Sequence, residues 1–282
     1  MATAYTRSDF RIHTDELVTL RGCTARYGIT RDLNIHYRKT GYWRQQFQYQ
    51  MLDAVRSAAL TYQEGKLDKA TAKDLWSENV GAFMTPKDVA LPLQELEQRR
   101  KVLQGNDAIL WLHDLLHQRR GPAYVKTCAH DYRLPLGDMI LLGTLDVVWH
   151  EPMADTYELW VFDTSFDPPP EILTRYYPSI VASAYACKSL LGVKPNTVRW
   201  VNPILELNKP LGVPPKEGET VLHGLAEHAY RIQRSKAWYP LIGDDCNFCP
   251  VAAECSAGAW LSQPELQQTI EAIQGKRKYR KR

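Results

Sequence analysis

Three cysteines within ten residues constrain this chain more than any other feature of its sequence. They form the motif Cys246-x2-Cys249-x5-Cys255 in the stretch DDCNFCPVAAEC. Thiols spaced this closely are typical of metal sites, and the chain must fold so that any fourth ligand meets them. The local spacing fits either zinc or an iron–sulfur cluster, and spacing alone slightly favours zinc. The chain holds six cysteines and begins without an apolar leader, so we expect metal binding or burial rather than disulfides.

Charge is distributed unevenly along the 282 residues. The net charge is only +3, but the last seven residues, KRKYRKR, carry six positive charges, so the remainder has a net charge of −3. A basic tail attracts polyanions, which makes nucleic acid an expected partner, and the alternative is a solvated tail that aids solubility. The basic residues of the tail are Lys276, Arg277, Lys278, Arg280, Lys281 and Arg282. No apolar run is long enough to cross a bilayer, so we expect a cytoplasmic protein with no membrane partner.

Helical periodicity dominates the first 120 residues. Apolar residues recur at helical spacing in 43–64 and 69–80, and a further helical block is expected over about 93–120. A shorter helix is predicted over 14–22, with Thr14 as its N-cap and a glycine at its end.

The hydrophobic period then changes to that of strands. We predict three strands at 123–136, 139–149 and 157–166, followed by a helix at 176–191 and a strand at 197–205. A loop rich in Pro and Gly follows at 210–219, and a last helix at 220–237. This order predicts an α/β or α+β core behind an N-terminal helical portion. We divide the chain into a helical portion, the α/β core, the cysteine loop, and a C-terminal helix with its tail, at 1–120, 121–240, 241–260 and 261–282.

Two carboxylates interrupt otherwise apolar strands, Asp146 in GTLDVVW and Asp163 in LWVFDTSF. A hairpin centred near residues 153 and 154 would place Asp146 opposite Val161, with Asp163 one diagonal step away on the same face. Two such carboxylates would hold a Mg²⁺ ion, which prefers oxygen ligands. The alternative is that arginine or backbone donors satisfy both acids, because an unpaired buried carboxylate is costly.

These strands resemble the core of the PD-(D/E)xK nuclease superfamily, in its RecB-like branch with the AddB subunit and the CRISPR-adaptation exonucleases. Gly143-Thr144-Leu145-Asp146 matches the G-x-x-D of that family, and Asp163-Thr164-Ser165 matches its D/E-x-K except that Ser165 replaces the lysine. The family's Q-x3-Y helix motif is also missing, since serines stand at positions 179 and 183. The resemblance implies a central mixed β-sheet flanked by helices, with Asp146, Asp163 and Ser165 at its catalytic position.

The cysteines extend this resemblance to both ends of the chain. Several members of the branch bind a [4Fe-4S] cluster through one cysteine near the N-terminus and a closing C-x2-C-x5-C. Cys23, in ELVTLRGCTARYGI, is similar to that first cysteine. The resemblance therefore implies a cluster on Cys23, Cys246, Cys249 and Cys255, with zinc as the alternative, joining the two ends of the chain. Cys128 and Cys187, in a predicted strand and helix, are expected to be buried core residues.

The missing lysine bears on whether catalysis survives. Lys188 and Lys126 are candidates to replace it, and the alternative is that each is a solvated surface lysine. The family also has a metal-binding histidine on a helix before the strands. His113 and His117 are four residues apart and share a helix face, so either fits this role, and the alternative is an ordinary interfacial histidine.

Two classes of function follow from the resemblance. With both the lysine and Q-x3-Y absent, we expect a degenerate active site. The protein would then be a DNA-binding or structural module of a DNA-processing assembly or of a viral (phage) assembly, such as a virion. The alternative is an active Mg²⁺-dependent DNA exonuclease with a relocated lysine. Trp238, Tyr239 and Tyr279 are further candidates to stack on bases, although core packing is the more ordinary role for them.

Overall fold

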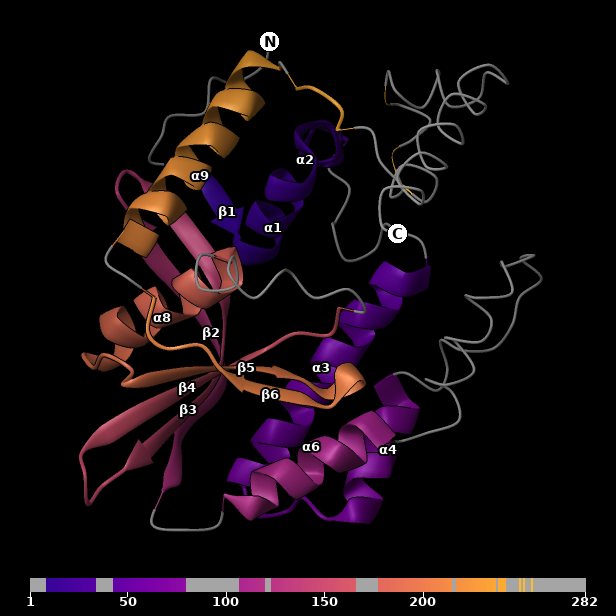
Figure 1. Ribbon diagram of the computed structural model, residues 1–282. Coiled ribbons are helices and arrows are strands. Elements are labelled where there is room, and N and C mark those ends of the chain that lie inside the picture. The colour runs from indigo at the N-terminus through magenta and orange to yellow at the C-terminus, as the bar shows by residue number, and fades with distance from the viewer. Residues whose placement is uncertain are drawn as a thin grey trace, which may run out of the picture. The chain divides into compact units, whose positions relative to one another are not determined.

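The computed structural model describes residues 9–33, 43–79, 107–119, 123–165, 177–214, 217–236 and 238–241, together with Cys249, Val251 and Cys255. Within these residues the chain forms a mixed six-stranded sheet and seven α-helices (Figure 1). The predicted mixture of helices and strands in an α/β or α+β core is therefore confirmed. The chain divides into two compact units, the first made of Met1–Asp15 with Phe47–Ala226 and the second of Glu16–Gln46 with Glu227–Arg282.

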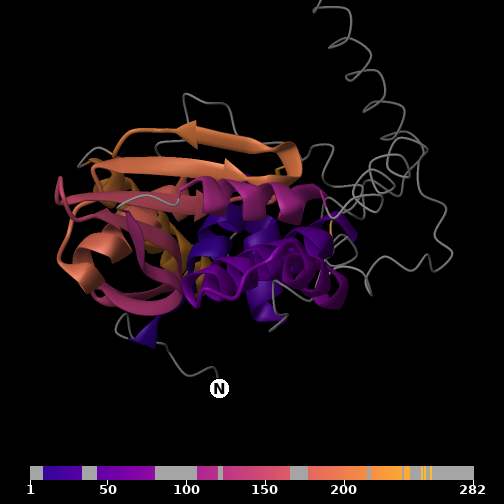
Figure 2. The ribbon, with the colours of Figure 1, turned by 90° about the horizontal axis from the view of Figure 1, so that it is seen from below.

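The first unit is built around the sheet. Its strands are β1 (Arg11–His13), β2 (Tyr124–Leu136), β3 (Met139–Glu151), β4 (Thr156–Phe162), β5 (Thr197–Asn202) and β6 (Leu207–Pro210). They follow the order β1-β3-β4-β5-β6, and β2 pairs antiparallel with β3. The β1–β3 and β4–β5 pairs are parallel, whereas β3–β4 and β5–β6 are antiparallel. Figure 2 shows β5 and β6, in orange, side by side at one edge.

The three successive strands predicted from the change of period are confirmed as β2, β3 and β4. The hairpin register is also confirmed, because Val147 pairs with Trp160, and this register places Asp146 opposite Val161. β3 is buried without interruption from Leu145 to Trp149. A strand covered on both faces has this continuous burial, and Asp146 lies inside the covered stretch.

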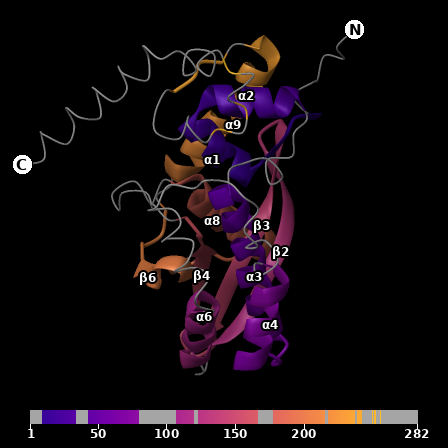
Figure 3. The ribbon, with the colours of Figure 1, turned by 90° about the vertical axis from the view of Figure 1, so that its right-hand side faces the viewer.

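Helices flank this sheet. They are α3 (Trp43–Gln63), α4 (Lys69–Asn79), α6 (Asp107–Gln118) and α8 (Pro178–Leu191), and a 3-10 turn η3 (Pro203–Leu205) follows β5. Helix α8 packs on β2, β3 and β4, whereas α6 packs on α4 and η3. Figures 1 and 3 show α3, α4 and α6 on one side of the sheet and α8 on the other. The predicted end of α8 is confirmed, because Gly192 caps it with a φ of 70°, which favours glycine.

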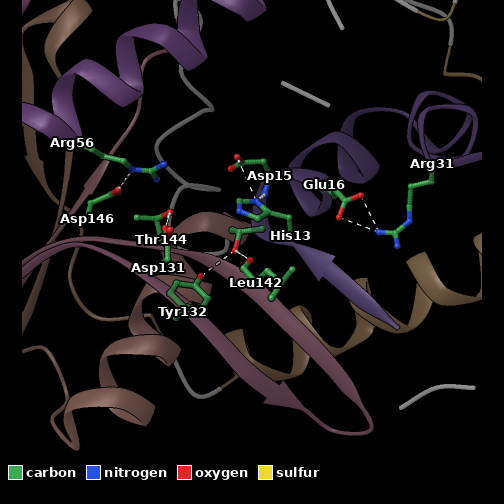
Figure 4. Close-up of polar contacts among 11 residues, drawn as sticks. His13, Asp15, Glu16, Arg31, Arg56, Asp131, Tyr132, Leu142, Thr144 and Asp146 are labelled. Carbon is green, nitrogen blue, oxygen red and sulfur yellow. Dashed lines mark hydrogen bonds and ion pairs between the residues drawn. The ribbon is translucent and has the colours of Figure 1, made fainter. Parts of the chain in front are cut away.

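The second unit contains most of α1 (Thr14–Gly22), all of α2 (Thr24–Asp32) and the end of α9 (Glu217–Ser235). Arg31 donates from Nη1 to both carboxylate oxygens of Glu16, at 2.9 and 3.0 Å (Figure 4). Trp238 lies against Gly28, where a Cβ would come within 2.4 Å of the indole ring. Gly28 therefore permits a close approach that no larger residue allows.

Candidate functional site

Asp146 is held by two donors from different elements of the first unit. The side chain is 3% exposed, and its Oδ1 accepts a hydrogen bond from Arg56 Nε at 2.7 Å. Its Oδ2 accepts from the backbone N–H of Phe162 at 2.8 Å. Figure 4 shows Arg56 reaching Asp146 from the helix that stands over β3. This is the second of our two alternatives for the acid, in which arginine and backbone donors satisfy it.

Burial dominates the electrostatics of Asp146. It raises the pKa of this carboxyl above its ordinary value, while the nearby Arg56 cation and the Phe162 N–H act in the opposite direction. Arg56 is itself only 15% exposed. The carboxylate and the guanidinium therefore form a buried ion pair, and each needs the other to offset its lost hydration.

Asp163 lies one residue past the end of β4 and has donors of its own. Its two oxygens accept from the backbone N–H of Ser165 at 3.1 Å, from the Ser165 hydroxyl, and from Asn202 Nδ2 at 3.3 Å. The same amide donates to the Ser165 carbonyl at 2.8 Å. Burial raises the pKa of Asp163, and the Ser165 hydrogen bonds oppose that rise. Ser165, which stands at the lysine position of the resembled motif, is thus a donor to the second carboxylate.

Gly143, the glycine of the G-x-x-D match, has a packing explanation. A Cβ at this position would come within 2.4 Å of the Tyr132 hydroxyl and 2.6 Å of Thr14 Oγ1. These two hydroxyls are 3.0 Å apart, and Thr14 also donates to the Leu142 carbonyl at 3.0 Å (Figure 4). The expected N-cap residue Thr14 therefore ties the start of α1 to β3 as well.

The two candidate histidines contact each other. The His113 and His117 rings stack with centroids 4.1 Å apart. His113 is buried and lies 2.8 Å from Asp114 Oδ1, and His117 Nδ1 lies 2.9 Å from the His113 carbonyl. His117 also meets the Tyr62 ring edge-on at 5.2 Å. Among the described contacts, these histidines are joined to Asp114 and Tyr62 and not to Asp146 or Asp163.

The candidate replacement lysines lie on the surface. Lys188 is 47% exposed on α8, and its Nζ is 3.1 Å from Glu219 Oε1. Lys126 is exposed on β2 at a break in the β2–β3 register. Both observations match the alternative of solvated surface lysines.

The candidate ligands Cys23, Cys249 and Cys255 belong to the second unit. Cys23 precedes α2, and its Sγ accepts the Arg26 N–H at 3.5 Å. The sequence lacks an ordinary N-cap at this point, which explains why α2 was not predicted. Cys23, Cys249 and Cys255 all pack against one small apolar cluster formed by Ala25, Ile29 and Val251, with Trp238 beside it. Three of the four proposed ligands, from opposite ends of the chain, therefore share one apolar neighbourhood.

The chemistry of this donor set fits a metal or an iron–sulfur cluster, since thiolates ligate both. Cys246 and the tail residues Lys276–Arg282 lie outside the described residues. Within the described residues, no three His, Cys, Asp or Glu side chains are grouped closely enough to hold a metal ion. The other two described cysteines are buried as predicted, and burial raises the pKa of both Cys128 and Cys187 to about 11.

Some residues of the site could not be anticipated from motifs. Arg56 and Asn202 are separated in sequence from the carboxylates they serve. The one signal for Arg56 is its place among the apolar residues of a predicted helix, next to Val55 and close to Ala58 and Ala59. No sequence pattern singled out Asn202, Tyr132 or Thr14 as partners.

Comparisons with known proteins place the chain in no family. No protein-family model matches the chain, and no curated protein matches it. Among solved structures, the chain is similar to one titled "Crystal structure of SSO0001", with 12% sequence identity and a TM-score of 0.37. That match covers 90% of this chain and 89% of the other. In the described part of the chain, no helix has the length and apolar character needed to span a membrane.

Proposed function

We propose that this protein is a DNA-binding module with a nuclease-like core that does not cleave, stabilised by a cysteine-ligated cluster. The observation that carries the proposal is the Arg56–Asp146 ion pair. A cation of the protein itself lies 2.7 Å from the carboxylate that would bind Mg²⁺ in an active member of the resembled family.

The ion pair argues against metal loading at Asp146 on electrostatic grounds. A Mg²⁺ ion needs the oxygen that Arg56 already contacts, and it would lie beside a positive charge. Displacing Arg56 would leave a guanidinium that is 15% exposed without its counterion. The carboxylate is therefore neutralised from within the protein.

The surroundings of Asp163 support the same conclusion. Ser165 has no positive charge to offer a phosphate in a transition state, and its hydroxyl is already used by Asp163. Lys188, the candidate replacement on the following helix, pairs with Glu219 at the surface. These features favour a degenerate site over a Mg²⁺-dependent exonuclease with a relocated lysine.

Cys23, Cys246, Cys249 and Cys255 would hold the [4Fe-4S] cluster, and zinc is the alternative for the same four thiolates. The cluster would act as a structural clasp between the two ends of the chain. Support comes from the shared packing of Cys23, Cys249 and Cys255 around one apolar cluster.

DNA is the partner favoured by the basic residues 276–282, whether the protein acts alone or within a larger nucleoprotein or viral assembly. The test is fluorescence anisotropy with labelled single- and double-stranded DNA at several salt concentrations. We expect affinity to fall steeply with salt, and deletion of 276–282 to reduce the logarithmic salt slope by up to about 5 for duplex DNA. Absence of binding, or binding that does not respond to salt, would refute the DNA-binding proposal.

A further inference from the structure

The first unit contains an open cleft that lies apart from the Asp146–Arg56 pair. Its cavity volume is about 810 Å³, which is within the range of small-molecule sites. Residues from the end of α3, the loop before α4, the last turn of α6 and the ends of β2 and β3 line it. They include Tyr62, Leu67, His117, Tyr124 and Trp149.

Trp149 supplies the strongest indication of a ligand. The residue is 2% exposed and lines the cleft. Its indole Nε1–H is buried and has no hydrogen-bond partner within the described residues. A buried N–H without an acceptor is costly, so a donor retained beside a cleft points to an acceptor delivered by a ligand.

His117 supplies the complementary group. Its Nδ1 is 2.9 Å from the His113 carbonyl, which can only accept, so Nδ1 carries a proton. In the neutral ring Nε2 is then a hydrogen-bond acceptor. The residues that line the cleft thus include an unpartnered donor on Trp149 and a ring nitrogen on His117 that can accept.

The rings also provide flat apolar surface. Tyr62 contacts both of these side chains, with its ring centroid 5.2 Å from that of His117 and 5.9 Å from that of Trp149. None of the described lining residues is Lys, Arg, Asp or Glu. The part of a ligand that enters the cleft is therefore uncharged, planar, and able both to accept and to donate hydrogen bonds at its edge.

A nucleobase has this combination of properties. We propose that the cleft binds the base of a nucleotide, with its ring against Tyr62 and its edge facing Trp149 and His117. This site is additional to the DNA-backbone contacts proposed above, because its lining offers no charge to a phosphate. The base could belong to a free nucleotide or to a single DNA strand.

The test is isothermal titration calorimetry of the full chain with the four deoxynucleoside monophosphates and with a short single-stranded oligonucleotide. Tyr62→Ala removes the stacking ring and should weaken binding about 5- to 150-fold, the range for base–aromatic stacking. Tyr62→Phe keeps the ring and should bind within about 2-fold of wild type, since it removes only the hydroxyl.

Trp149→Phe tests the donor against a matched core variant. It should weaken binding about 3- to 10-fold through loss of one hydrogen bond. Trp160 is also fully buried and packs on Trp149 at 5.3 Å, but its Nε1–H already donates to Glu158. Trp160→Phe therefore carries a similar packing change and should leave the affinity unchanged.

Each outcome decides the proposal. Binding of monophosphates that Tyr62→Ala and Trp149→Phe weaken supports a free-nucleotide site, and the same losses seen with the oligonucleotide alone support a strand base. No measurable binding of either ligand, or equal affinity in wild type and both cleft variants, overturns it. Deletion of 276–282 separates this result from the DNA-backbone proposal, because monophosphate binding in the cleft should not depend on the tail.

Discussion

Replacing Arg56 by Met should destabilise the first unit strongly. The substitution keeps much of the side chain's apolar length but removes the charge that faces Asp146 at 2.7 Å. The remaining carboxylate is 3% exposed and retains the hydrogen bond from the Phe162 N–H. Breaking one side of such a buried pair costs about 3–5 kcal/mol of unfolding free energy.

The stability lost in Arg56→Met should depend on pH in a defined direction. Burial already raises the pKa of Asp146, and loss of the Arg56 cation raises it further. A folded-state pKa above the unfolded value means that the folded protein binds the proton more tightly. Stability of Arg56→Met should therefore fall as pH rises above about 4, the ordinary Asp value, and recover as pH is lowered towards it.

Urea unfolding followed by circular dichroism at pH 7 measures this loss. Lys66→Met is the matched control, because it breaks a surface pair with Glu64 whose side chains are 72% and 48% exposed. Such pairs contribute at most about 1 kcal/mol. Adding Asp146→Asn to Arg56→Met should restore part of the lost stability. An Arg56→Met protein within about 1 kcal/mol of wild type at pH 7 would refute the buried ion pair.

Further predictions concern the cysteines and three glycines. Cys23→Ala and Cys249→Ala should each lower both the bound iron or zinc and the stability of the protein. The reason is that a clasp over the 223 residues from Cys23 to Cys246 contributes about 5 kcal/mol by analogy with a disulfide. A stable, metal-replete Cys23→Ala protein would contradict this, and the control Cys187→Ala should keep its metal. Purified protein should be brown and absorb broadly near about 400 nm, whereas a colourless anaerobic preparation with stoichiometric zinc would favour zinc. In thermal unfolding, Gly143→Ala should lower the stability by about 1–3 kcal/mol, because the added methyl group overpacks against Tyr132. Gly22→Ala is the control and should leave the stability nearly unchanged, because no atom lies within 4 Å of the added Cβ. Gly28→Ala should lower the melting temperature of the second unit through its clash with Trp238.

The sequence predicted the helices and strands whose hydrophobic pattern continues over many residues. Helices α3, α4 and α8 and strands β2 to β4 agree with their predicted ranges to within a few residues. β1 and β6 were missed because strands of three and four residues carry too little alternation to detect. The described residues include α6 at Asp107–Gln118, while the rest of the predicted block over 93–120 lies largely outside them.

At the carboxylate site, the sequence predicted the two acids and Ser165 but not the other donors. Asp146 and Asp163 are conspicuous because charged residues are rare within apolar strands. Their partners Arg56 and Asn202 come from α3 and β5, 90 and 39 positions away in the chain. Such pairings depend on how helices and strands pack, which local patterns do not encode. The sequence therefore posed the choice between metal and internal donors, and the tertiary contacts favour internal donors.

DNA cleavage tests the central claim most directly. Wild-type protein and Asp146→Ala should be incubated with labelled single- and double-stranded DNA in Mg²⁺ and in Mn²⁺, at concentrations where the wild type binds DNA. With Asp146 neutralised by Arg56, we predict that the DNA stays intact with both proteins. Metal-dependent cleavage by the wild type that Asp146→Ala abolishes would contradict the account.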